Sequence, residues 1–178
     1  MGVKYTRYRD IPQFTSAGSW QADFDLKNFV EHIENEVKKF GLQLNPKFQR
    51  GHVWTEEQQI AWLEFFLKGG KTGRVIYLNC PSWYNPSYSY DYDEYVCVDG
   101  LQRITAIQRF VNDEIKVFGS YCSEFEDRLR VTHTIKLNVN DLKTEKEVLQ
   151  WYVEMNSGGT PHTQEEIERV VKMMEECE

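Results

Sequence analysis

Residues 99–103 of the sequence read Asp-Gly-Leu-Gln-Arg and combine an acid, a flexible residue, an amide and a cation. They fall where an apolar stretch typical of a strand, residues 95–98, gives way to one typical of a helix, residues 104–111. A helix N-terminus leaves backbone N–H groups without partners and carries partial positive charge, so it attracts anions. This junction could therefore receive the phosphates of a ligand.

Each polar residue of the junction suits a role in phosphate chemistry. Gly100 allows close approach of a backbone or a positive φ, and the planar guanidinium of Arg103 matches phosphate oxygens. Asp99 could bind a metal ion, hold Arg103 or act as a base, and Gln102 could orient a water molecule or a phosphate oxygen. A structural alternative stays open, in which Asp99 caps the helix and forms a salt bridge with Arg103.

A second polar stretch, residues 46–54, precedes another predicted helix. It contains Gln49, Arg50 and a glycine, with the aromatic residues Phe48 and Trp54 on either side. Such a loop can also receive an anion, and either aromatic residue could stack on a nucleotide base. In the structural alternative, it is a surface loop whose two aromatic side chains plug the core as a hydrophobic staple.

A third stretch begins at Asn156 and contains the consecutive glycines Gly158 and Gly159. Backbone N–H groups can converge on a ligand in such a segment, although consecutive glycines also simply end helices. The stretch is neither a Walker A loop nor a GxGxxG motif. The four histidines share no spacing, and only His52, inside the second stretch, is a candidate for a site.

The elements that must position these stretches are predicted from apolar periodicity and capping residues. Asp25 caps a helix over residues 26–40, which ends at Gly41. Thr55 and Gln58 form a capping box that begins the next helix. Further strands are predicted at residues 75–79, 95–98, 115–118 and 131–139, and further helices at residues 104–111, at about 144–155, and after Thr163.

The length of 178 residues fits one domain with a sizeable core. Residues 1–24 are interpreted as an irregular N-terminal arm and residues 25–178 as the domain. The formal net charge of −7 argues against a protein that coats nucleic acid through a general positive field, although it leaves a local basic cleft open.

The four cysteines are widely spaced and form no CxxC pair, so neither a zinc site nor a disulfide framework is expected. The N-terminal residues lack the pattern of a signal peptide, and no apolar run approaches the roughly 18 residues that span a bilayer. These features predict a protein of the reducing cytoplasm with no membrane partner.

The segments NPKFQRGHVW, VDGLQRITAI and MNSGGTPHT, in that order, resemble the GmrSD-type N-terminal domain family over about residues 25–170. The resemblance implies one α/β domain of ParB/sulfiredoxin-like fold, with a small mixed sheet flanked by helices. It also implies a domain that binds nucleotides, and often hydrolyses them, in restriction of modified DNA and other phage defence. The residues implied as catalytic are Asp99, Gln102 and Arg103, and those implied to bind nucleotide or phosphate are Gln49, Arg50, Trp54, Gly100, Asn156, Gly158 and Gly159.

The sequence departs from the family pattern at Leu101, where Gln is common, at Phe48, where Tyr is common, and at His162, where Leu is common. Many relatives continue into a nuclease domain of the His-Asn-His type. The expected partners are therefore a nucleotide, DNA, and a protein such as a separate nuclease subunit.

Three hypotheses of function follow. In the main one the domain hydrolyses a nucleoside triphosphate: Arg50 and Arg103 hold phosphates, and Asp99 binds Mg²⁺ or activates water with Gln102. The first alternative is a non-catalytic module that senses a nucleotide or phosphate and binds a protein. The second is a metal-dependent nuclease that nicks DNA.

Overall fold

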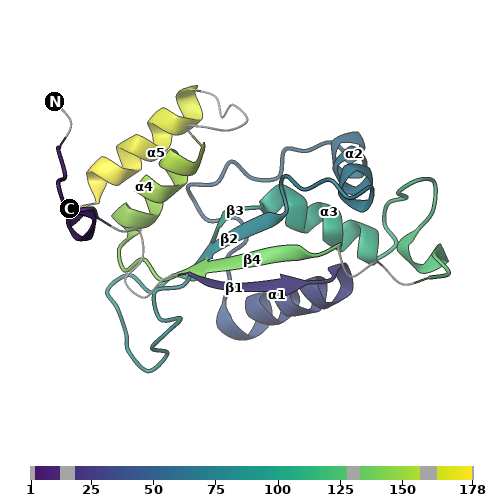
Figure 1. Cartoon of the computed structure of the whole chain (residues 1–178), viewed down its shortest axis with the longest axis horizontal. Coiled ribbons are helices and arrows are strands. Elements are labelled where there is room, and N and C mark those ends of the chain that lie inside the picture. The colour runs from purple at the N-terminus through teal and green to yellow at the C-terminus, as the bar shows by residue number, and fades with distance from the viewer. Residues whose placement is uncertain (1–2, 13–18, 128–132, 157–163, 178) are drawn as a thin grey trace.

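The computed structural model describes residues 3–12, 19–127, 133–156 and 164–177. In these residues the chain forms five α-helices and a sheet of four strands (Figure 1). The helices are α1 (Leu26–Phe40), α2 (Glu56–Leu67), α3 (Leu101–Val111), α4 (Glu145–Asn156) and α5 (Gln164–Glu176). The strands are β1 (Trp20–Phe24), β2 (Val75–Asn79), β3 (Val96–Asp99) and β4 (Ile135–Asn140). The predicted α/β class, a small mixed sheet flanked by helices, is confirmed.

The sheet has the strand order β1-β4-β2-β3 and mixes both kinds of pairing. β4 runs antiparallel to β1 and parallel to β2, and β2 runs antiparallel to β3. β1 comprises the last residues of the predicted N-terminal arm, so this part of the arm is an edge strand of the sheet. On the opposite edge, Gln43 forms an isolated parallel bridge with Val96 of β3.

Helices cover both faces of the sheet, which makes three layers. On one face α1 and α3 bury residues such as Phe29 and Ile107 in a cluster with Leu78 of β2. On the other face Val98 of β3 lies in a second cluster with Trp151 of α4. Figure 1 shows α4 and α5 side by side and apart from the other helices. None of the helices in the described ranges has the length and apolar character that a bilayer crossing requires.

Local chemistry sets the ends of the first two helices as predicted. The Asp25 carboxylate accepts hydrogen bonds from backbone N–H groups at the start of α1, and Gly41 ends that helix with φ of 73°. Thr55 and Gln58 form the capping box of α2, each side chain bonding the backbone N–H of the other residue. Capping depends on residues within one turn, which is why the sequence suffices to place these ends.

Two predicted strands differ from the observed ones. Residues 115–118 form no strand, because the chain reverses at Phe118 and Gly119, which have φ of 52° and 80°. Only a single bridge joins Val117 to Ser120 there. The predicted strand 131–139 is β4, which begins at Ile135; residues 131 and 132 lie outside the described part of the chain.

Candidate functional site

Gly100 forms the junction between β3 and α3 and has a backbone conformation that other residues rarely adopt. Its φ is 130° and its ψ is 0°. A Cβ atom added there would lie 2.5 Å from Cδ1 of the buried Ile76 side chain. The junction therefore needs glycine for its backbone angle and for the close approach of β2.

Asp99 and Arg103 form an ion pair across this junction, with 2.5 Å between Asp99 Oδ2 and Arg103 Nη2. Arg103 also donates from Nη1 to the Val75 carbonyl oxygen at 2.9 Å. Asp99 does not cap α3: Gly100 occupies the N-cap position, and the Asp99 carboxylate accepts a hydrogen bond from Arg103 instead. The alternative in which Asp99 is purely structural predicted both a salt bridge and a helix cap. The salt bridge is confirmed, and the cap is wrong.

The Arg103 side chain is more deeply buried than its partner, with 14% exposed against 38% for Asp99. The guanidinium is therefore held in one place by the Asp99 carboxylate and the Val75 carbonyl. A cation fixed in this way needs little reorganisation to receive a further anion.

Gln102 connects α3 to the loop before α2. Its Oε1 accepts hydrogen bonds from the backbone N–H groups of Val53 and Trp54, both at 3.0 Å. Its Nε2 donates to the Gly51 carbonyl oxygen at 2.8 Å. The structure thereby brings together two of the three polar stretches, and it gives Gln102 a positioning role.

Gln49 fastens the same loop to the sheet. Its Nε2 donates to the backbone carbonyl oxygens of Cys97, at 3.1 Å, and Val98, at 2.8 Å. Arg50 is half-buried and lies between Gln49 and Gly51, both of which are anchored by hydrogen bonds. The loop that carries Arg50 is thus held at two points against β3 and α3.

Trp54 precedes α2 and lies next to two aromatic residues of that helix. Its ring lies 6.1 Å from that of Trp62, centroid to centroid, and Trp62 lies 5.6 Å from Phe66. The backbone carbonyl of Trp54 also accepts a hydrogen bond from Gln59. These contacts fix the indole, and stacking of Trp54 on a base stays a prediction. His52, the other candidate in this loop, is exposed.

The third polar stretch is described only at its first residue. Asn156 is the last residue of α4, and its Nδ2 donates to the Tyr152 carbonyl oxygen at 2.7 Å. Tyr152 packs edge-on against Phe48, with ring centroids 5.2 Å apart, so α4 contacts the second stretch. Gly158 and Gly159 lie outside the described residues.

Arg169 of α5 is a site contact that the sequence did not predict. Its guanidinium donates to the Phe48 carbonyl oxygen at 3.0 Å, and to those of Lys47 and Gln49 at 3.4 Å. No spacing or motif marks this residue within a strongly charged helix, and only the tertiary structure brings it to the loop.

Cys97 lies beside the site and has the wrong properties for a nucleophile. It is fully buried in the middle of β3. Burial, with a smaller contribution from the Asp99 charge, raises the pKa of the thiol to about 12. The thiolate is the reactive form of cysteine, so the neutral Cys97 acts as a small apolar core residue.

Mg²⁺ fits the site only as an ion shared with a ligand. In the described ranges, no group of three or more His, Cys, Asp or Glu residues could hold a metal ion. Mg²⁺ often uses one or two carboxylates and takes its other ligands from phosphates and water. The partly exposed Asp99 could supply one such oxygen.

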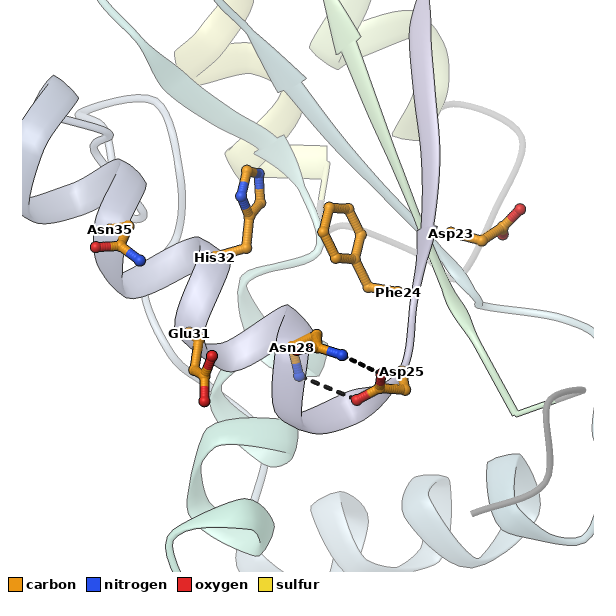
Figure 2. A pocket seen from close by; sticks show the side chains of 7 residues that line it. All are labelled: Asp23, Phe24, Asp25, Asn28, Glu31, His32 and Asn35. Atoms are coloured by element: carbon orange, nitrogen blue, oxygen red, sulfur yellow. Dashed lines mark hydrogen bonds between the residues drawn. The ribbon is translucent and has the colours of Figure 1, made fainter. Parts of the chain in front are cut away.

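A hollow of about 440 Å³ lies elsewhere, between β1 and α1. Asp23, Asp25, Asn28 and Glu31 are among the residues that line it (Figure 2), and the Asp23 side chain points away from α1. The acidic residues around this hollow disfavour a phosphate group. This hollow therefore does not suit the ligand that the sequence predicts.

His32 lines that hollow but packs against its wall. Its ring stacks on that of Phe24 with 4.7 Å between centroids. His32 Nδ1 lies 3.9 Å from the Glu36 carboxylate, and in the part of the chain described here Nε2 has no hydrogen-bond partner.

The family model of the GmrSD restriction endonuclease N-terminal domain matches residues 26–134. This range is more than half of the chain and includes both the Gln49 loop and the Asp99 junction. No curated protein and no solved structure matches the chain significantly.

Proposed function

We propose that this chain, which belongs to the GmrSD restriction endonuclease N-terminal domain family, binds a nucleoside triphosphate between residues 49–54 and the start of α3. The observation that carries the proposal is the set of hydrogen bonds from Gln102 to residues 51, 53 and 54. These bonds hold together two segments that lie about fifty residues apart and that each carry residue types suited to phosphate, which supports one shared site.

Three features of this site suit a triphosphate. The N-terminus of α3 offers backbone N–H groups and the positive end of the helix dipole. Arg103 is a cation held rigidly beside that N-terminus. Arg50 lies in the loop that Gln49 and Gln102 anchor, and so adds a second positive charge to the region.

We propose hydrolysis as the reaction. Water attacks the terminal phosphorus, the bond from that phosphorus to the bridging oxygen breaks, and a nucleoside diphosphate and inorganic phosphate leave. Mg²⁺, when bound with the phosphates, would neutralise charge on their oxygens. Asp99 would hold that ion or accept the proton of the water, and Arg103 would stabilise the charge that develops on the transferred group.

Phosphate release by the purified chain, with an equimolar mixture of the four ribonucleoside triphosphates and Mg²⁺, tests hydrolysis. We expect Asp99→Ala to lower the rate about a hundredfold, because the carboxylate is the acid–base or metal-binding group. Asp23→Ala, which removes an exposed aspartate from the hollow beside α1, is the matched control and keeps the wild-type rate. Equal rates for Asp99→Ala and wild type would exclude the catalytic role.

A second candidate function is nucleotide binding without turnover. It is favoured by the observation that Asp99 and Gln102 are both engaged in contacts that hold the site together. In this case the domain senses a nucleotide and acts through a protein partner, such as a DNA-cleaving subunit in keeping with the restriction family. Saturable binding of a triphosphate with no phosphate release by the wild type would select it over the hydrolase.

A further inference from the structure

α5 lies outside the range that the family model matches, yet it contacts the loop of the proposed site. Arg169 of this helix donates hydrogen bonds to three consecutive carbonyl oxygens, those of residues 47, 48 and 49. A guanidinium has several donors in a rigid plane, so one side chain can gather adjacent carbonyls in this way. The residue that follows these three is Arg50.

Apolar packing supports the same contact. Phe48 is 3% exposed and lies in a cluster with Tyr152 of α4 and Val170 of α5. Val170 is adjacent to Arg169, so one turn of α5 supplies both an apolar and a polar contact to the loop. Gln49 holds the loop to β3 from the other side.

We infer that Arg169 is a positioning residue of the nucleotide site and that docking of α5 and nucleotide affinity are linked. The inference rests on the proposed function. Without Arg169 the backbone of residues 47–49 loses a charged donor, and the loop that carries Arg50 samples more conformations. Fewer molecules then present the binding geometry, and the apparent affinity falls by that fraction. Because coupling is reciprocal, bound nucleotide must also stabilise the docked α5.

Hydrogen exchange of the full chain tests the link, with the equimolar mixture of four ribonucleoside triphosphates and Mg²⁺ as the probe. In wild type we expect the mixture to slow exchange in residues 47–54 and also in α5. In Arg169→Ala, half-maximal protection of residues 47–54 should need about ten times more nucleotide, as expected for loss of a charged hydrogen-bond donor. The protection of α5 by nucleotide should disappear.

Two further variants separate positioning from folding. Lys172→Ala removes a positive charge from an exposed position of the same helix and should behave as wild type. Arg169→Lys keeps the charge but loses the planar fork, so its affinity should lie between those of wild type and Arg169→Ala. If Arg169→Ala does not fold, two measurements still test the inference. They are the protection of α5 by nucleotide in wild type and the nucleotide affinity of Arg169→Lys.

The possible failures are distinguishable. Wild-type protein that the mixture does not protect anywhere overturns the proposed function, and the inference with it. Wild-type protein protected at residues 47–54 but not in α5 overturns the inference alone. Wild-type nucleotide affinity in Arg169→Ala also overturns the inference alone.

Discussion

The chain passes from strand through aspartate to helix twice, and the two junctions use the aspartate differently. Asp25 follows β1 directly, and its Oδ1 accepts hydrogen bonds from Lys27 and Asn28 backbone N–H groups, both at 3.0 Å. Asp99 ends β3 but stands one residue further from its helix, because Gly100 occupies the cap position. Its carboxylate turns to Arg103 instead. One inserted glycine thus changes an aspartate from a helix cap into half of an ion pair.

The two helix starts also differ in the charged residues around them: acids at α1 and an arginine at α3. At the start of α1, the capping residue Asp25 and two further acids, Asp23 and Glu31, are among the residues around the hollow of Figure 2. At the start of α3, Gly100 stands at the cap position in place of an acid, and Arg103 is fixed close to it. We therefore propose the start of α3, next to this anchored cation, as the site in preference to the hollow.

The largest effect is expected from Gly100→Ala, which removes the feature that distinguishes the two junctions. Alanine is strained at φ of 130°, and its Cβ would force the buried Ile76 side chain to move. We expect a loss of about 3 kcal/mol in the free energy of unfolding, measured by urea denaturation. Phosphate release or nucleotide binding should fall with it.

Gly41→Ala is the matched control for this change. Gly41 also has a positive φ, of 73°, but an added Cβ there meets nothing within 4 Å. Its cost should be backbone strain alone, about 1 kcal/mol. If both variants lose the same free energy of unfolding, the close approach of Gly100 to Ile76 does not contribute to stability, and the start of α3 does not depend on it.

Gln102→Ala should have the next largest effect, because it separates the α3 junction from the loop without changing either backbone. The Val53 and Trp54 N–H groups lose their acceptor and the Gly51 carbonyl loses its donor. We expect about 2 kcal/mol of lost stability and faster hydrogen exchange in residues 51–54. Nucleotide affinity should fall because the two halves of the site separate.

Gln58→Ala provides the control for Gln102. Gln58 also accepts a hydrogen bond from a loop N–H group, that of Thr55, but within the capping box of α2. Its loss should cost about 1 kcal/mol and leave nucleotide affinity unchanged. Wild-type affinity in Gln102→Ala would show that the loop is no part of the site.

The sequence predicted the parts of this comparison that depend on near neighbours. The cap at Asp25, the stop at Gly41 and the capping box of Thr55 each involve residues within about one turn, and all three are confirmed. The prediction of a strand at residues 115–118 was wrong, because burial of alternate residues does not by itself show that a segment pairs in a sheet. Ile115 and Val117 are buried, but they reach the core from a reversing chain rather than from a sheet.

The roles of the site residues depend on contacts that local patterns do not encode. The prediction that Gln102 orients water or a phosphate oxygen stays untested, and the local pattern did not show that its amide bonds three backbone groups some fifty residues earlier in the chain. Gln49 satisfies two carbonyls of β3, and Arg169 reaches its loop across about 120 residues. Residue type indicated which side chains of the two motifs are candidates for a site. Only the packing of β3, α3 and α5 shows what each one holds.

Asp25→Ala should have the smallest effect on stability, and it tests the comparison by changing the α1 junction instead of the α3 junction. The change removes the acceptor of two N–H groups at the start of α1, which costs about 1 kcal/mol in unfolding free energy, measured by urea denaturation. It also reduces the negative charge of the hollow, which would favour an anion there if the hollow were the site. Nucleotide affinity should nevertheless stay at the wild-type value if the phosphates bind at α3, as we propose. A change in affinity with unchanged hydrogen exchange in residues 47–54 would instead place the ligand beside α1, where the carboxylates now argue against it.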